Sequence, residues 1–120
     1  MVLLDTNIFI YLANGTLSAE MIAETDIAHA TVTKIEALGY PTIPANELLL
    51  LGGLFRESYS LDLTEIIIET AIRLRQARQM SLGDSIIAAT ALEKELELWT
   101  ANVDDFKHVE GLKVINPLQK

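Results

Sequence analysis

Cysteine is absent from this chain of 120 residues. Disulfides, thiolate metal ligands and thiol catalysis are therefore excluded. No apolar run reaches the roughly 18 uncharged residues that a membrane-spanning helix requires. The N-terminus carries neither a basic leader nor a cleavage-like site, so we expect a cytoplasmic protein without a membrane partner. Histidine is also scarce, and oxygen atoms with the imidazoles of His29 and His108 are the only ligand types left for a metal ion.

Basic residues are outnumbered, since 9 Lys and Arg face 17 Asp and Glu and the formal net charge is −8. Affinity for phosphate normally comes from Lys and Arg, so this balance lowers the expectation of nucleic-acid binding. Two bound divalent cations would reduce the net charge to −4. A nucleic-acid function would then come with weak intrinsic binding or with a basic segment supplied by a partner.

The order of apolar and polar segments predicts one α/β domain over residues 1–120. Short apolar runs alternate with amphipathic stretches, which favours a parallel sheet of four to five strands covered by helices on both faces. We expect strands at 1–4, 27–31, 58–61, 96–100 and 112–115. We expect helices at 8–13, 18–24, 33–38, 45–57 with an interruption at the glycines 52 and 53, 63–79, 84–95 and 103–106.

Acidic residues recur where the expected strands pass into helices. Asp5 follows the first strand, Glu36 lies in the helix after the second, Asp84 begins a helix that returns to the sheet, and Asp104 and Asp105 follow the fourth strand. Ligands of parallel sheets bind outside the carboxyl ends of the strands. These acids therefore predict a divalent-metal site at one edge of the sheet.

Each acid also has a purely structural interpretation. Asp5 and Asp84 both stand where a helix N-cap is expected. Glu36 differs, because its apolar neighbours Ile35 and Ala37 would desolvate an unpaired carboxylate. Several clustered carboxylates would repel each other by roughly 4 kcal/mol per close pair at an effective dielectric near 20. A bound cation removes that repulsion, and an all-oxygen ligand set suits one or two Mg²⁺ or Mn²⁺ ions, as in two-metal nucleases.

Four segments in order resemble a known family over essentially the whole chain. They are LDTNI at 4–8, TKIE at 33–36 with LGYP at 38–41, GDSIIAATA at 83–91, and TANVDDF at 100–106 before the Asn-Pro pair at 116–117. Together they resemble PIN-domain ribonucleases, and most closely the VapC toxins of bacterial toxin–antitoxin pairs.

The resemblance implies a PIN fold, Mg²⁺- or Mn²⁺-dependent endoribonuclease activity on RNA, and inhibition by a cognate antitoxin protein. It also implies catalytic and metal-binding roles for four acids, with support from three neighbouring polar residues. The acids are Asp5, Glu36, Asp84 and Asp105, and the supporting residues are Thr6, Asn7 and Asn102. For the fourth acid, Asp104 and Asn102 remain alternatives to Asp105.

Other features have competing interpretations. Arg73, Arg75 and Arg78 form the only basic cluster, which serves either RNA binding or simply a solvated helix face. The leucines at 48–51 exceed what one face of a short helix can bury, so we expect part of this segment in a homodimer or antitoxin interface. We expect Trp99 in the core, and both histidines at strand ends or on the surface, without catalytic roles.

Two other functions fit the acids. One is a non-catalytic module in which the carboxylates hold a structural metal or a partner's arginine. The other is an aspartyl-phosphate phosphatase or receiver-like domain, which is disfavoured because Asn7 rather than a second acid stands two residues after Asp5.

Overall fold

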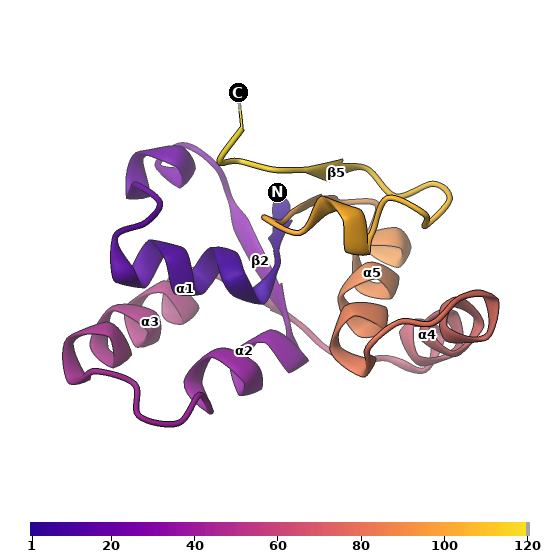
Figure 1. The fold of residues 1–120 in the computed structure, drawn as a ribbon, viewed down its shortest axis with the longest axis horizontal. Coiled ribbons are helices and arrows are strands. Elements are labelled where there is room, and N and C mark those ends of the chain that lie inside the picture. The colour runs from indigo at the N-terminus through magenta and orange to yellow at the C-terminus, as the bar shows by residue number, and fades with distance from the viewer. Residues whose placement is uncertain (120) are drawn as a thin grey trace.

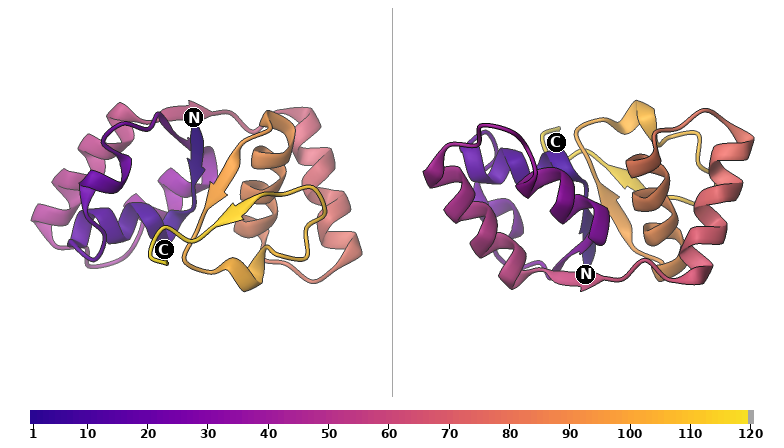
Figure 2. Two further views of the ribbon diagram at one scale, coloured as in Figure 1. Left: turned by 90° about the horizontal axis from the view of Figure 1, so that it is seen from above. Right: turned by 90° about the horizontal axis from the view of Figure 1, so that it is seen from below.

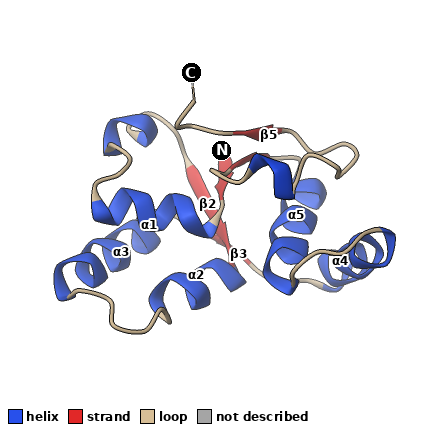
Figure 3. Ribbon diagram, viewed as in Figure 1, coloured by secondary structure: helices blue, strands red, loops and turns tan. Residues whose placement is uncertain are grey.

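The computed structural model describes residues 1–119, which form five strands, five α-helices and two short 3₁₀ helices (Figures 1 and 3). In chain order the elements are β1 (Val2–Leu4), α1 (Thr6–Asn14), η1 (Ala19–Ile22), β2 (Ile27–Ala30), α2 (Thr31–Leu38), α3 (Ala45–Glu57), β3 (Tyr59–Leu61), α4 (Glu65–Ala77), α5 (Leu82–Lys94), β4 (Glu97–Trp99), η2 (Val103–Asp105) and β5 (Val114–Ile115).

All five strands are parallel, in the order β3-β2-β1-β4-β5. The central strand β1 pairs with β2 on one side and with β4 on the other. Leu3 is opposite Ala28 in the first pairing and opposite Leu98 in the second. The expected α/β class with a parallel sheet is confirmed, and β1, β2 and β4 end at the same edge.

Helices cover both faces of the sheet because successive strand residues point to opposite sides. Val2 and Leu4 pack into a core with α1, α2 and α3, whereas Leu3 packs with α5 in a second core. Figure 2 shows the two layers, with α1 and α3 on one side of the strands and α4 and α5 on the other. Ala88 and Ala91 are fully buried in the second core, since their small side chains let α5 lie close to the sheet.

Several expected helix bounds differ from the structure: α1 begins at Thr6 rather than at residue 8, α4 spans Glu65–Ala77 rather than 63–79, and α5 begins at Leu82 rather than at Asp84. Gly52 and Gly53 do not interrupt α3, which runs unbroken from residue 45 to 57. Glycine costs about 1 kcal/mol in a helix, but the buried side chains of Leu51 and Phe55 hold α3 on the core on both sides of the pair. Helix α2 begins at Thr31, two residues before the expected start, directly after β2. Within the described residues, no helix is both long and apolar enough to cross a membrane.

Candidate active site

Asp5 lies at the carboxyl end of β1 and is 4% exposed. One carboxylate oxygen accepts a hydrogen bond from the backbone N–H of Thr6 at 2.8 Å, so Asp5 is also the N-cap of α1. The other oxygen accepts from the hydroxyl of Thr100 at 2.7 Å. Burial nevertheless raises the pKa of Asp5, and the nearby carboxylates of Glu36 and Asp105 add to the rise. The N-cap interpretation is confirmed, and it coexists with a carboxylate held at the edge of the sheet.

Glu36 lies in the second turn of α2 and is exposed, so the expectation that its apolar neighbours desolvate it is wrong. Ile35 points away from the core and is 68% exposed, because the helix turns each successive side chain by about 100°. The hydroxyl of Thr6 donates to Glu36 Oε1 at 2.7 Å. Glu36 Oε2 lies over Gly83 of α5, where an added Cβ would stand 2.6 Å away.

Asp84 is the third residue of α5 and is half-buried. The expectation that it caps this helix is wrong. Ser81 is the N-cap, and its hydroxyl accepts a hydrogen bond from the backbone N–H of Asp84 at 3.1 Å. The side chain of Asp84 is thus not needed as a cap. Burial first, and then the charges of Asp5, Asp105 and Glu36, raise the pKa of Asp84 to about 6.

Asp104 and Asp105 point in different directions. Asp104 is solvated, with its side chain 88% exposed, and forms an ion pair with Lys107 at 3.0 Å. The charge of Asp105 raises the pKa of both Asp5 and Asp84, so it faces the other acids. Phe106 is fully buried and holds the turn against the second core, as expected from its position after the acids.

Asp5, Glu36, Asp84 and Asp105, here called the carboxylate cluster, therefore meet across distances in sequence of up to 100 residues. They come from the end of β1, from α2, from the start of α5 and from η2 after β4. The charges of Asp5, Glu36 and Asp105 all raise the pKa of Asp84. The cluster carries concentrated negative charge at the carboxyl edge of the sheet.

The supporting residues serve partly different purposes from those expected. The hydroxyl of Thr6 orients Glu36, while only its backbone N–H holds Asp5. Asn7 Oδ1 is 3.5 Å from the backbone nitrogen of Ala101, which joins the start of α1 to the loop after β4. Asn102 precedes η2 without a side-chain capping bond.

Thr100 and Gly83 are site residues that the sequence argument did not single out. The strand pairing gives a signal for Thr100. Leu4 pairs with Trp99, so the residues that follow them, Asp5 and Thr100, leave neighbouring strands at the same level. A hydroxyl at the end of the neighbouring strand is well placed to hold a carboxylate. The role of Gly83 depends on the approach of α2 to α5, for which the sequence carries no signal.

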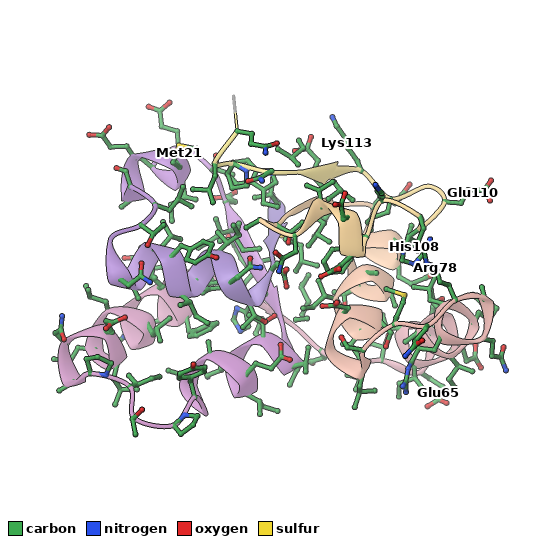
Figure 4. The ribbon with its side chains drawn as sticks, viewed as in Figure 1. Met21, Glu65, Arg78, His108, Glu110 and Lys113 are labelled. Carbon is green, nitrogen blue, oxygen red and sulfur yellow. The ribbon has the colours of Figure 1, made fainter. Side chains whose placement is uncertain are left out.

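The three arginines do not form one basic surface. Arg73 donates to Thr70 Oγ1 at 3.0 Å, and Arg75 donates to the carbonyl of Met80 at 3.2 Å. Of the three, only Arg78 lines a hollow with Asp84, Asp105 and His108. Figure 4 labels Arg78 and His108, which lie near each other. Among the three arginines, only Arg78 lies beside the carboxylate cluster.

His29 is a core residue, so the expectation of a strand-end or surface position is wrong. It is 2% exposed, its Nδ1 is 2.8 Å from Ser58 Oγ, and it packs edge-on against Phe9 and Phe55. Burial lowers the pKa of His29, which keeps the ring neutral. Trp99 is half-buried and packs against the first core, broadly as expected.

The residues present fit a hard divalent cation. The side chains of the carboxylate cluster offer only oxygen atoms, and the pKa of Asp84 is raised by burial first and then by the neighbouring negative charges, which a cation would compensate. Within residues 1–119, no three acids or histidines stand close enough to form a metal shell by themselves. Mg²⁺ usually binds through one or two carboxylates and keeps several waters, whereas structural Zn²⁺ needs four protein ligands. The arrangement therefore suits Mg²⁺ or Mn²⁺.

Comparison with known proteins agrees with this geometry. The sequence pattern of the PIN domain matches residues 2–112. A toxin–antitoxin complex from Klebsiella pneumoniae contains a chain that is 30% identical, with 98% of each chain covered and a TM-score of 0.80. VapBC2 from Rickettsia felis, bound to a DNA fragment from its promoter, is 21% identical over 97% of this chain and 98% of its own, with a TM-score of 0.80. VapBC-1 from nontypeable Haemophilus influenzae is 22% identical over 99% and 100%, with a TM-score of 0.79. Among curated proteins, no sequence matches this chain.

Fold and site together define a parallel α/β protein with a carboxylate cluster at the carboxyl edge of its sheet. The chain belongs to the PIN-domain family, whose members are generally nucleases. The resemblance to VapC-type PIN toxins drawn from the sequence is confirmed.

Proposed function

We propose that this protein is a Mg²⁺- or Mn²⁺-dependent endoribonuclease that acts as the toxin of a toxin–antitoxin pair. The observation that carries the proposal is the carboxylate cluster, in which four acids share one edge of the sheet. Burial first, and then the charges of the other acids, raise the pKa values of Asp5 and Asp84. Structural acids would be expected to pair with Lys or Arg. Here the acids face each other instead, which is typical of sites that hold a cation.

The chain's own residues hold the cluster in place before any ligand arrives. Thr100 and the backbone of Thr6 fix both oxygens of Asp5, and the Thr6 hydroxyl fixes one oxygen of Glu36. Such preorganisation lowers the cost of forming the reactive arrangement. A divalent ion bound there would lower the pKa of an attacking water and would stabilise the leaving oxygen of a phosphodiester. Asp5, Asp84, Glu36 and Asp105 are the proposed ligands of one or two ions, and bound water would complete each shell because no three of them stand close enough to form one alone.

RNA binding would draw on Arg78, whose side chain is exposed beside Asp84 and Asp105. With a net charge of −8, the protein offers little other attraction for phosphate. Cleavage should therefore fall only gradually with added salt, because the salt dependence grows with the number of phosphates that Lys and Arg neutralise. Arg73 and Arg75 contribute little to this proposal because their side chains bind Thr70 and Met80.

The antitoxin partner is proposed to cover the apolar surface of α3 and the adjoining hollow. Leu48, Leu49 and Leu50 are 46%, 77% and 53% exposed, and Tyr40 beside them is 63% exposed. A largely apolar hollow of about 350 Å³ lies between α1 and α3 and reaches Asn7, close to the carboxylate cluster. Exposed apolar groups of this extent are typical of interaction surfaces. A partner seated there could place a basic side chain over the acids.

Purified protein free of any partner provides the test. It is incubated with total RNA and either Mg²⁺, Mn²⁺ or EDTA, and the cleavage ends are mapped. We expect metal-dependent ends with the wild type and none with Asp5→Asn or Asp84→Asn, since each substitution removes a proposed ligand with little change in volume. Asp26→Asn, at an exposed acid remote from the cluster, is the matched control.

The alternative is a non-catalytic module in which the same carboxylates bind a metal or a partner's arginine without turnover. The hydrogen bonds that already satisfy Asp5 and Glu36 are compatible with such a role. Metal binding without RNA cleavage, under conditions where calorimetry shows the cluster to be saturated, would favour this alternative over the nuclease.

A further inference from the structure

A polar hollow of about 380 Å³ adjoins the carboxylate cluster on the side of the C-terminal segment. We call it the amide hollow, because Asn102, Asn116 and Gln119 line it together with Asp104 and Asp105. Among residues 1–119, no Lys or Arg lines it. The volume is in the range of small-ligand sites. The three amides come from the loop before η2, from the end of β5 and from the C-terminal turn, so no single turn motif accounts for their convergence.

The amides have hydrogen-bonding groups to spare. Asn116 uses its Oδ1 to accept from the backbone N–H of Leu118 at 2.9 Å, which leaves its NH₂ group as a donor. Asn102 is exposed and stands at the N-cap position of η2, yet its side chain makes no capping bond. An Asn in this position usually caps. Its carbonyl and NH₂ groups are therefore available to a ligand in the hollow.

Neutral amides complement the edges of nucleobases, because they pair a donor with an acceptor in one plane. Phosphate would be expected to bind next to an unpaired cation. In the described part of the chain no Lys or Arg lines the amide hollow, and Lys107, which reaches its wall, is paired with Asp104 at 3.0 Å. The carboxylates of Asp104 and Asp105 add acceptors and negative potential. They would accept from an exocyclic amine, while the free NH₂ of Asn116 would donate to an unprotonated ring nitrogen beside that amine. Adenine and cytosine present this pair of groups, whereas guanine has a ring N–H beside its amine and uracil has no amine.

We propose that the amide hollow binds an unpaired nucleobase with an exocyclic amine, adenine or cytosine, of a nucleotide next to the cleaved bond. This inference rests on the proposed ribonuclease function. Asp105 belongs both to the carboxylate cluster and to the wall of the hollow, so a base in the hollow places its own phosphate at the acids. Contacts to phosphate carry no sequence information. The hollow gives the enzyme a preference at one position beside the cut.

Binding is measured first, with the Asp84→Asn protein so that no cleavage interferes. Fluorescein-labelled oligoadenylate, oligocytidylate and oligouridylate are titrated by anisotropy in Mg²⁺. We expect at least one of the first two to bind at least about fivefold more tightly than oligouridylate, the lower end of what one amide–base contact supplies. The affinities for oligoadenylate and oligocytidylate, compared with each other, show which amine-bearing base is bound. Adding Asn102→Ala should bring the ratio close to one, while Asn46→Ala, which removes an exposed amide at the start of α3, should not change it.

Cleavage-end mapping with the otherwise wild-type protein is the second measurement. Adenine or cytosine should be enriched at one fixed position beside the cut, and Asn102→Ala should abolish the enrichment. Metal-dependent cleavage in which Asn102→Ala leaves base preference unchanged would overturn the inference and leave the proposed function standing. Base discrimination in the titrations without any cleavage would support the hollow and reject the nuclease. Loss of partner binding in Asn102→Ala with equal affinity for all three oligonucleotides would assign the hollow to a protein and overturn the inference.

Discussion

Asp104 and Asp105 are neighbours in the chain but have different surroundings. The first forms an exposed ion pair with Lys107, and the charge of the second acts on Asp5 and Asp84. Adjacent residues in a helical turn point about 100° apart, so the burial of Phe106 allows only one of the two to face the acids. At the residue scale, this geometry decides which acid belongs to the proposed site.

We predict that Asp105→Asn lowers the rate of RNA cleavage at least about tenfold, which corresponds to about 1.4 kcal/mol of transition-state stabilisation. Asp104→Asn should change the rate little, because its ion pair is exposed and such pairs contribute at most about 1 kcal/mol. Side-by-side kinetics at saturating Mg²⁺ measure both. The reverse ranking would mean that the assignment is shifted by one residue, and equal small effects would mean that Asp105 is not a ligand.

At the scale of secondary-structure elements, helices α2 and α5 meet at the point where Glu36 Oε2 lies over Gly83. Gly83 lies inside α5 and does not need positive φ, so its lack of a side chain serves the close approach of Glu36. An added methyl group would stand 2.6 Å from that oxygen. Glu36 is exposed, so its carboxylate can swing aside without disturbing the core.

We therefore predict that Gly83→Ala lowers cleavage about tenfold or more while leaving stability unchanged or raised. Alanine is up to about 1 kcal/mol more favourable than glycine within a helix. Gly53→Ala in α3 is the matched control, because its nearest heavy atom, Arg56 Nη2, is 3.9 Å away. It should stabilise the protein without affecting cleavage. Thermal unfolding and cleavage rates are measured for both variants. If Gly83→Ala cleaves RNA at the wild-type rate, the placement of Glu36 over Gly83 has no role in cleavage.

The charge balance of the whole molecule makes its stability depend on pH and on cations. The pKa of Asp84 rises from 3.8 to about 6 in the folded protein, and that of Asp5 is also raised. The folded state thus holds these protons more tightly than the unfolded state. Stability from these groups is present at low pH and is lost as the pH rises from about 4 to about 6.

We predict that the melting temperature of the metal-free protein at pH 7 rises by several degrees in Asp84→Asn, and that the difference shrinks towards pH 4. Saturating Mn²⁺ should raise the melting temperature of the wild type at pH 7. The same addition should have much less effect on Asp84→Asn, which lacks a ligand. Calorimetric scans from pH 4 to pH 8 with Mn²⁺ or EDTA test this prediction. An unchanged wild-type melting temperature in Mn²⁺ would contradict a metal site at the cluster.

Association through α3 is the second prediction for the whole molecule. We propose that the chain is a homodimer whose contact includes part of the leucine surface of α3, with Leu50 in the dimer contact and the rest left to the antitoxin, and that Leu50→Glu makes the chain monomeric in light scattering. Leu50 is 53% exposed, so a charge there should spare the core, whereas Leu54 packs against it. Ile72→Glu on α4, at 50% exposure, is the control. A monomeric wild type would remove the dimer proposal, and dissociation by Ile72→Glu alone would move the contact to α4.

The sequence by itself determined the class of the fold and indicated which acids form the candidate site. The alternation of apolar runs and amphipathic stretches gave the parallel sheet, because strand and helix periods are local properties of the chain. The positions of Asp5, Asp84 and Asp105 after strands or near a helix start indicated one shared edge. Boundaries were less well determined, as in α3, where packing of Leu51 and Phe55 outweighs the low helix propensity of two glycines.

Only the tertiary structure decided which side chains surround each acid. Thr100 holds Asp5 across 95 residues of sequence, and Gly83 makes room for Glu36 across two helices. Burial of His29 and exposure of Glu36 were likewise set by packing rather than by their neighbours in the chain. Local patterns show on which face of its own helix or strand a residue lies. A contact between two elements depends instead on how closely those elements approach each other. That approach is fixed by the whole core and is encoded in no single segment.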